Sequence, residues 1–209
     1  MNLALFDLDN TLLPIDSDYA WGEFTNRIGW TDPVSFKSKN DQFYADYLAG
    51  ALDIHDYVRF ATESVRLRGP EAAAKAHAQF MKEIILPQIK PQALDLVKTH
   101  QAAGDHVMIV TATNEFVTRP IAQALGVQEL IAVELARDSQ AWITGEIVGT
   151  PSFKEGKVLR IEQWLSAHQK TWQDVQITFY SDSINDLPLL ERAQIPVAVN
   201  PDRKSTRLN

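Results

Sequence analysis

Four aspartates, two near each end of the chain, are the side chains best suited to chemistry. Asp7 and Asp9 directly follow a short apolar run, and Asp182 and Asp186 follow another. Carboxylates gathered in one place raise each other's pKa, and burial raises it further, so such a group needs a cation among its members. Oxygen ligands without cysteine or a nearby histidine suit a hard cation, Mg²⁺ above others. We therefore predict a site for Mg²⁺ and a substrate phosphate where the four acids meet.

These acids can take separate roles in phosphoryl transfer. Asp7 can attack phosphorus as the nucleophile. Asp9, two residues later, can protonate the leaving alkoxide and then deprotonate the water that opens the aspartyl-phosphate. Asp182 would bind Mg²⁺ directly, and Asp186 would contribute to the metal site as a supporting or water-mediated partner. This division of roles predicts hydrolysis of a phosphomonoester.

Three further polar residues complete the predicted site. Thr111 follows another apolar run, and its hydroxyl would donate to a phosphate oxygen of the substrate. Lys157 opens a predicted helix and supplies positive charge, and Lys154, before the same helix, is the alternative lysine. Asn185 would help Asp186 to orient this lysine and contact the substrate, and it could also cap a helix that begins at Asp186.

Short apolar runs alternate with helical patterns along most of the chain. Strands are predicted at 3–6, 106–110, 177–180 and 196–199, and helices at 92–103, 114–125 and 155–168. This alternation predicts an α/β fold with a parallel sheet, which binds ligands at the carboxyl ends of its strands. Residues 142–147 are predicted as one strand of a separate hairpin. The catalytic candidates would therefore meet at one edge of the sheet.

Residues 16–86 lack a comparable strand and are predicted to form a helical insert above the end of the first strand. The chain would then consist of a core, residues 1–15 and 87–209, and this insert. The aromatic residues of the insert, from Trp21 to Tyr47, are interpreted as its packed interior.

One predicted helix of the insert has an apolar stripe and an opposite polar face. The stripe runs from Ile54 to Val65 at helical spacing, and the opposite face carries His55, Arg59, Thr62 and Arg66. That face is either solvated or turned toward the leaving group of the substrate. Arg59 is therefore included among the substrate-binding candidates.

The composition argues against several classes of protein. Twenty Lys and Arg residues against 27 Asp and Glu give a net charge of −7, and the basic residues are scattered. We therefore expect no nucleic-acid partner. No apolar run is long enough to cross a bilayer, and we expect no membrane association. The absence of cysteine excludes disulfides and thiolate sites. The expectation is a cytoplasmic protein whose partner is a small phosphomonoester.

The motifs, taken in order, resemble those of a known family. Asp7-x-Asp9-x-Thr11, Thr111, the helix-opening lysine and Asp182-x-x-Asn185-Asp186 are similar to the four motifs of the haloacid dehalogenase superfamily of phosphohydrolases. The resemblance covers roughly residues 3 to 200 and points to the phosphoserine-phosphatase-like branch, subfamily IB. It implies a Rossmann-like core, a helical C1-type cap after the first strand, and a Mg²⁺-dependent reaction through an aspartyl-phosphate. It also implies Asp7, Asp182 and the backbone carbonyl of Asp9 as metal ligands.

The substrate-holding positions differ from those of phosphoserine phosphatases. The Glu, Phe and Arg that hold the amino acid in those enzymes correspond here to Asp16, Ile54 and Ala61. Asp16 is kept as a substrate-binding candidate. The resemblance implies histidinol phosphate, phosphoserine or another small phosphomonoester as the substrate.

Three other functions share this set of residues. A dehalogenase would not need the second acid, so Asp9 argues against that activity. A phosphotransferase or mutase would use every catalytic residue and differ only in excluding water. A Mg²⁺-binding regulator without catalysis is disfavoured because it has no use for an acid beside the nucleophile.

Overall fold

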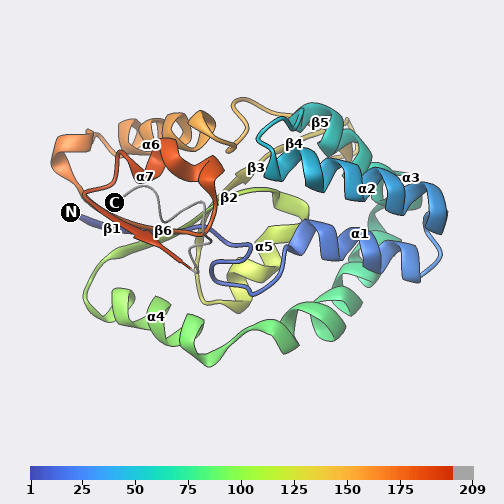
Figure 1. Ribbon diagram of the computed structural model, residues 1–209, viewed down its shortest axis with the longest axis horizontal. Helices are drawn as coiled ribbons and strands as arrows, with labels where there is room; N and C mark the ends of the chain where they lie inside the picture. The colour runs from blue at the N-terminus through green and yellow to red at the C-terminus, as the bar shows by residue number, and fades with distance from the viewer. Residues whose placement is uncertain (200–209) are drawn as a thin grey trace.

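The centre of the molecule is a parallel sheet of five strands. The computed structural model describes residues 1–199, and in it the strands lie in the order β3-β2-β1-β6-β7 (Figure 1). Their bounds are β1 Asn2–Phe6, β2 His106–Asn114, β3 Glu129–Val133, β6 Gln176–Ser181 and β7 Ile195–Ala198. The α/β fold is confirmed, with β1 in the middle of the sheet. Strand β3 was not predicted, and the last ten residues of the predicted core, 200–209, lie outside the described part of the chain.

Each face of the sheet is covered by helices because the strands are apolar on both sides. In β1, Ala4 and Phe6 pack into one core cluster, and Leu3 and Leu5 pack into the other. Fully burying a side chain the size of leucine contributes about 1.5–3 kcal/mol. Figure 1 shows α4 on one side of the sheet and α6 and α7 on the other. The bounds are α4 Pro91–Ala102, α5 Glu115–Ala124, α6 Glu155–Ala167 and α7 Leu187–Leu190.

Residues between β1 and α4 are helical, as the sequence predicted. Helices α1 (Ser17–Arg27), α2 (Pro33–Leu48) and α3 (Ile54–Phe80) are together called the helical segment. Their N-caps are the aspartates Asp16, Asp32 and Asp53, whose side chains accept hydrogen bonds from backbone N–H groups of the first turn. The chain continues through a π-helical turn, Met81–Ile85, and a 3-10 turn, Leu86–Gln88.

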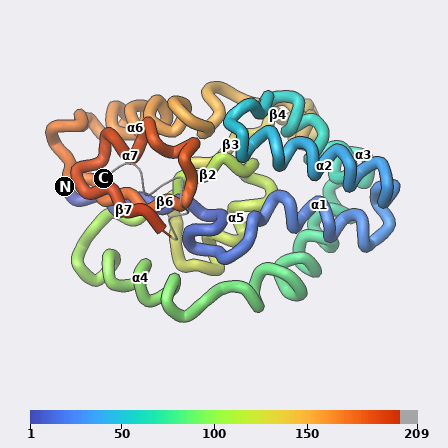
Figure 2. The backbone as a smooth tube through the Cα atoms, viewed as in Figure 1, coloured from blue at the N-terminus to red at the C-terminus, as the bar shows by residue number. Residues whose placement is uncertain are grey.

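The helical segment lies beside the sheet, at the end where β1 stops (Figures 1 and 2). Helix α3 bends at Gly69, whose φ of 78° is open to glycine at little cost, and Pro70 follows it. The domain boundaries at residues 16 and 87 stay a prediction. Among residues 1–199, no helix combines the length and apolar character that crossing a bilayer requires.

A two-stranded antiparallel hairpin packs on α3. It confirms the strand predicted at 142–147 and consists of β4 (Leu135–Arg137) and β5 (Ile143–Ile147). The Arg66 side chain lies so close to Gly145 that a Cβ there would stand 2.8 Å from Arg66 Nε. Thr62 is buried and donates to the Val58 carbonyl at 2.7 Å. This helix face was predicted to be either solvated or turned toward the leaving group; His55 and Arg59 are exposed, whereas Thr62 is buried and Arg66 lies beside the hairpin.

Candidate active site

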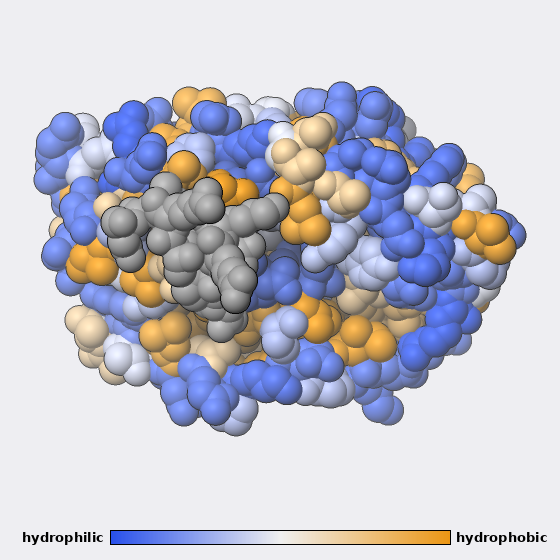
Figure 3. All heavy atoms as spheres, viewed as in Figure 1, coloured by the Kyte–Doolittle hydropathy of each residue, from blue (hydrophilic) through white to orange (hydrophobic). Residues whose placement is uncertain are grey.

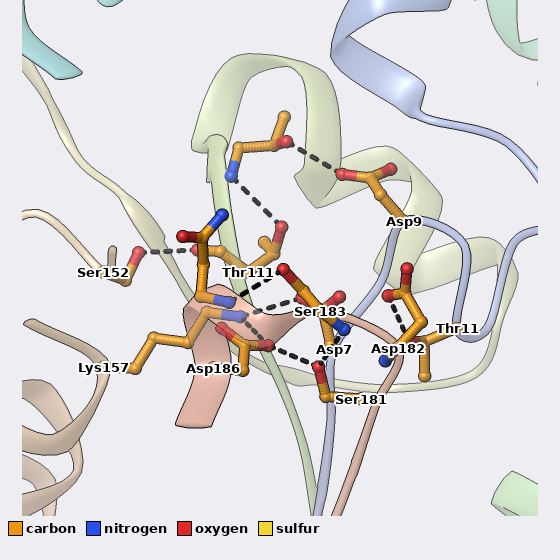
Figure 4. Close-up of polar contacts among 12 residues, drawn as sticks. Asp7, Asp9, Thr11, Thr111, Ser152, Lys157, Ser181, Asp182, Ser183 and Asp186 are labelled. Atoms are coloured by element: carbon orange, nitrogen blue, oxygen red, sulfur yellow. Dashed lines mark hydrogen bonds and ion pairs between the residues drawn. The ribbon is translucent and has the colours of Figure 1, made fainter. Parts of the chain in front are cut away.

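The carboxyl end of β1 places Asp7 at the centre of the sheet edge. Its backbone N–H donates to the Tyr180 carbonyl at 2.9 Å, which continues the pairing of β1 with β6 for one residue. The chain then turns, because the backbone N–H groups of Thr11, Leu12 and Leu13 all donate to the Leu8 carbonyl. This turn keeps Asp9 near the same edge (Figure 4).

Lys157 lies buried between two carboxylates. Its Nζ is 2.9 Å from Asp7 Oδ1 and 2.7 Å from Asp186 Oδ2, and the residue is 1% exposed. Burial alone would lower the pKa of Lys157, but the charges of Asp186 and Asp7 outweigh it and raise that pKa. The Ser181 hydroxyl also donates to Asp186 Oδ2, at 2.7 Å. The lysine therefore stays charged and fixes the position of Asp7.

The structure distinguishes the two candidate lysines. Lys154 Nζ donates to the carbonyl of Gly50, in the loop after α2, and contacts neither Asp7 nor Asp186. Lys157 reaches the acids because the start of α6 lies close to the preceding turn. At Gly156 the approach is so close that an added Cβ would stand 1.9 Å from the Pro151 carbonyl oxygen. Only glycine fits that approach.

Asp9 is held by hydrogen bonds and forms no ion pair within residues 1–199. Its Oδ1 accepts from the Ser17 backbone N–H at 2.7 Å, and its Oδ2 accepts from the Thr113 hydroxyl at 2.9 Å. Burial, followed by the charge of Asp16, raises the pKa of Asp9 to about 7. At neutral pH this carboxyl group can therefore donate or accept a proton.

Asp182 is positioned by a residue whose role the sequence did not indicate. Its Oδ1 accepts from the Thr11 hydroxyl at 3.1 Å, and that same hydroxyl accepts from the Asp182 backbone N–H at 3.1 Å. Burial raises the pKa of Asp182, and the hydrogen bond from Thr11 opposes the rise. The Asp-x-Asp-x-Thr spacing was the available signal for this contact.

Thr111 is buried at the end of β2 with its hydroxyl near the other polar groups. Thr111 Oγ1 accepts from the Thr113 backbone N–H at 3.1 Å, which leaves the hydroxyl proton free to donate. The Ser152 hydroxyl donates to the Thr111 carbonyl at 2.6 Å (Figure 4). Sequence reasoning missed the contributions of Ser152, Thr113 and Ser181, because a lone Ser or Thr carries no spacing signal.

Asn185 does not cap the following helix, contrary to the prediction. Ser183 caps the 3-10 turn Ile184–Asp186, with its Oγ accepting from the Asn185 backbone N–H at 3.2 Å. The Asn185 amide Nδ2 instead donates to the carbonyl of Tyr47, near the end of α2, at 2.9 Å. Asn185 therefore links the sheet edge to the helical segment.

Part of this set borders a cavity of about 330 Å³ between the sheet edge and the helical segment, namely Asp7, Asp9, Thr111, Asp182 and Asn185. Figure 3 shows the hollow on this face, with hydrophilic side chains at its bottom. Its lining contains five aspartates and, among residues 1–199, no lysine, arginine or histidine. The aspartates are Asp7, Asp9, Asp16, Asp18 and Asp182.

Aromatic side chains form much of the opposite wall. Trp21 and Phe24 are buried in the core, as predicted, but Phe43, Tyr44 and Tyr47 line the cavity. The interpretation of all these aromatic residues as packed interior was therefore wrong in part. A sequence stripe at helical spacing does not reveal which helix face borders a cavity.

Two predicted substrate contacts have different outcomes. Asp16 borders the cavity, and its Oδ1 accepts from the Tyr19 backbone N–H at 2.8 Å. Arg59 is exposed, does not line the cavity, and forms ion pairs with Asp56 and Glu146. The structure thus gives the Arg59 guanidinium other partners, on the hairpin side of α3.

The donor set at the bottom of the cavity fits Mg²⁺. Asp7 and Asp182 both present carboxylates to the cavity, and Asp186 does not line it. Among residues 1–199 no three acidic or histidine side chains converge as a complete metal cage. Mg²⁺ needs only one or two carboxylates, because water and a substrate phosphate complete its coordination. Burial raises the pKa of Asp7 despite Lys157, and a bound cation would favour its charged form.

Two known proteins are similar to nearly the whole chain. A histidinol-phosphatase of Neisseria meningitidis serogroup C (strain 8013) is 44% identical over 202 residues, covering 96% of this chain and 91% of that protein. A crystal structure described as a protein with unknown function from Bordetella pertussis Tohama I has a TM-score of 0.92 at 44% identity, covering 99% of this chain and 93% of that one.

A more distant neighbour supports the fold. A substrate-bound phosphoserine phosphatase has a TM-score of 0.68 at 17% identity, covering 98% of this chain and 89% of that chain. The model of the haloacid dehalogenase-like hydrolases matches residues 4–191 of the sequence. With nearly the whole described chain matched, this protein belongs to the haloacid dehalogenase-like hydrolase family.

Proposed function

We propose that this chain hydrolyses a small phosphomonoester with Mg²⁺, through an aspartyl-phosphate on Asp7. The observation that carries the proposal is the state of the Asp7 carboxylate. Lys157 holds Oδ1 at 2.9 Å, whereas Oδ2 has no hydrogen-bond partner among the described residues, and the side chain borders the cavity. One oxygen is thus fixed and the other is available to attack phosphorus.

The positions of the neighbouring groups support the following steps. Asp7 Oδ2 forms a bond to phosphorus as the bond from phosphorus to the alcohol oxygen breaks, and Asp9 donates a proton to that oxygen. Asp9 then takes a proton from the water that attacks the phosphoryl group, which releases inorganic phosphate and restores Asp7. The Asp9 pKa of about 7 suits both steps.

The other residues hold the phosphate and the nucleophile. Thr111 donates its hydroxyl proton to a phosphate oxygen, and Lys157 offsets the negative charge that gathers around Asp7. Asp7, Asp182 and the backbone carbonyl of Asp9 would hold Mg²⁺, which would draw charge from the phosphate oxygens. Asp186 serves as the partner of Lys157 rather than as a direct ligand, since its Oδ2 is occupied by Lys157 and Ser181.

Histidinol phosphate is the first substrate to test, because the 44% identical relative is described as a histidinol-phosphatase. Phosphoserine is the second, because a phosphoserine phosphatase of Lactococcus lactis is 26% identical over 196 residues. The leaving alcohol would occupy the part of the cavity bordered by the helical segment.

The test is phosphate release by the purified full chain from these two compounds and from p-nitrophenyl phosphate, with Mg²⁺ or with EDTA. We expect Mg²⁺-dependent release, and we expect Asp7→Asn to lower kcat/KM at least about a thousand-fold. Asparagine preserves the oxygen that contacts Lys157, so circular dichroism should be unchanged. Full activity of Asp7→Asn, or activity undiminished by EDTA, would contradict the proposal.

A further inference from the structure

Lys154 has a backbone conformation that favours glycine. It lies directly before α6, with a φ of 53° and a ψ of −124°. Residues other than glycine that have a positive φ are found mostly at ψ values of about +30° to +60°, so this conformation is strained for a lysine. Glycine would adopt it at little cost. Strain of this kind persists where surrounding contacts hold the residue in place, and it is most often found at functional sites.

The Lys154 side chain reaches across to the helical segment. Its Nζ donates to the carbonyl of Gly50, in the loop after α2, and lies 5.2 Å from the centre of the Phe153 ring. The Phe153 ring in turn packs on the ring of Tyr47, near the end of α2, with 6.0 Å between the ring centres. The residue before α6 is thus bound to the end of α2 through its ammonium group and through an adjacent aromatic ring.

Two further hydrogen bonds join the same end of α2 to the loop after β6. The Asn185 Nδ2 group donates to the Tyr47 carbonyl at 2.9 Å, and the Tyr47 hydroxyl lies 3.4 Å from the Ser183 hydroxyl. Tyr47, Ser183 and Asn185 all line the cavity. Together with the hydrogen bond from Lys154 to Gly50, these contacts close the seam between α2 and the sheet edge.

Helix α2 otherwise packs on the other helices of the helical segment. Within the described chain only Phe36 and Asn40 of α2 are buried. The Phe36 ring lies beside Gly22 of α1 and stacks on Phe60 of α3, with 4.7 Å between the ring centres. Yet α2 supplies a whole wall of the cavity, from Asn40 to Leu48. The position of this wall relative to the sheet edge therefore depends on the polar contacts at the end of α2.

We propose that Lys154 is a positioning residue for this wall, because its ammonium group fixes the end of α2 relative to the sheet edge. The role rests on the proposed hydrolysis, in which the leaving alcohol lies against the wall. It also accounts for a lysine where the backbone favours glycine, since glycine would relieve the strain and lose the contact. Lys154 does not line the cavity and contacts neither Asp7 nor Asp186, so it acts on the reaction only through α2.

Three substitutions of Lys154 separate the side chain from the backbone. Lys154→Met removes the ammonium group and keeps the strained backbone, Lys154→Gly removes both, and Lys154→Arg keeps a donor for the Gly50 carbonyl. We expect Lys154→Gly to unfold about 2–4 °C above Lys154→Met, because only glycine relieves the strain. Equal unfolding temperatures would show that the residue is not strained and would overturn this account of the lysine.

Hydrogen exchange measures the contact without any substrate. The backbone N–H groups of Ala49, Gly50 and Ala51 donate to carbonyls of the last turn of α2. We expect them to exchange about fivefold faster in Lys154→Met and Lys154→Gly than in the wild-type chain, the factor expected from losing one hydrogen bond. Lys154→Arg should restore slow exchange. Wild-type exchange rates in the Met and Gly variants would overturn the proposal.

Gln169→Gly is the matched control for the backbone. Gln169 also has a positive φ, 56°, but it is exposed and lies after the far end of α6. The substitution should leave hydrogen exchange at residues 49–51 unchanged. Faster exchange there in Gln169→Gly would show that any loosening of α6 has this effect, and would remove the specific role of Lys154.

Kinetics with p-nitrophenyl phosphate test whether the contact affects the substrate. In Lys154→Met and Lys154→Gly we expect KM to rise at least about threefold while kcat changes less than about twofold, because a displaced wall weakens binding and leaves Asp7 and Lys157 in place. Unchanged KM values alongside faster exchange would overturn the positioning role. If the wild-type chain does not hydrolyse this ester with Mg²⁺, the proposed hydrolysis fails, and the exchange rates still decide whether Lys154 fixes α2.

Discussion

Acidic side chains have different partners at the sheet edge and beside the helical segment. At the sheet edge, Asp7 and Asp186 share one buried lysine at 2.9 and 2.7 Å. Beside the helical segment, Asp16 and Asp18 receive hydrogen bonds but no cationic partner among residues 1–199. The first arrangement fixes the proposed nucleophile before substrate arrives, and the second leaves two carboxylates whose pKa values are raised.

The largest expected effect comes from removing the shared cation. Lys157→Met leaves two buried carboxylates unpaired and should lower the free energy of unfolding by about 3–5 kcal/mol, measured in urea at pH 7.5. Lys154→Met is the matched control. It removes one hydrogen bond to the Gly50 carbonyl and should cost about 1 kcal/mol. Equal losses in the two variants would show that the sheet edge is not organised around Lys157.

Beside the helical segment, removing a charged carboxylate is expected to raise the free energy of unfolding at high pH. The pKa of Asp18 is raised from 3.8 to about 7 in the folded chain, so the folded state binds this proton more tightly than the unfolded state. The stability from that proton is complete below about pH 4 and is lost as the pH rises through 7. Because each unit of pKa difference is worth about 1.4 kcal/mol, the free energy of unfolding lost by pH 8 is at most about 4 kcal/mol.

Asp18→Asn should therefore unfold at a higher temperature than the wild-type chain at pH 8, and the difference should shrink toward pH 4. Differential scanning calorimetry across this range measures it. If Lys157→Met lowers and Asp18→Asn raises the stability of the folded chain at the same pH, the two groups of acids differ as described. A destabilised Asp18→Asn at pH 8 would mean that this carboxylate is already compensated.

The smallest effect concerns Asp9, which lies between the two groups of acids. As a general acid it must be protonated, and its pKa is raised to about 7. For an alkyl phosphate, kcat/KM should fall about tenfold for each pH unit above 7. p-Nitrophenyl phosphate has a leaving group that needs no proton, so its profile should be flatter over the same range. Parallel profiles for the two substrates would argue against Asp9 as the acid.

Patterns along the chain were sufficient to predict the fold class and the residues at the sheet edge. The aspartates and Lys157 were found because each follows a buried strand or opens a helix, and parallel topology brings those positions together. Strand β3, Glu129–Val133, was missed although its Leu-Ile-Ala-Val run has the same apolar character as the others. That signal was present in the sequence.

Contacts between distant segments could not be predicted in the same way. The choice between Lys157 and Lys154 depends on how closely α6 approaches Pro151. The place of Arg59 depends on a hairpin that packs on α3. Tyr44 borders the cavity because of how α2 lies against the sheet edge. These outcomes are set by tertiary packing, which periodicity within one helix does not encode.

The pairing of Asp7 with Lys157 joins residues 150 positions apart, and β1 lies between β2 and β6. During synthesis Asp7, the proposed nucleophile, leaves the ribosome long before Lys157, and its strand cannot acquire both neighbours until residue 181 has emerged. In the nascent chain, Asp7 thus stays exposed to water and behaves as an ordinary carboxylate through most of translation. Reactivity toward phosphate esters is acquired only when the last third of the polypeptide closes around the first strand.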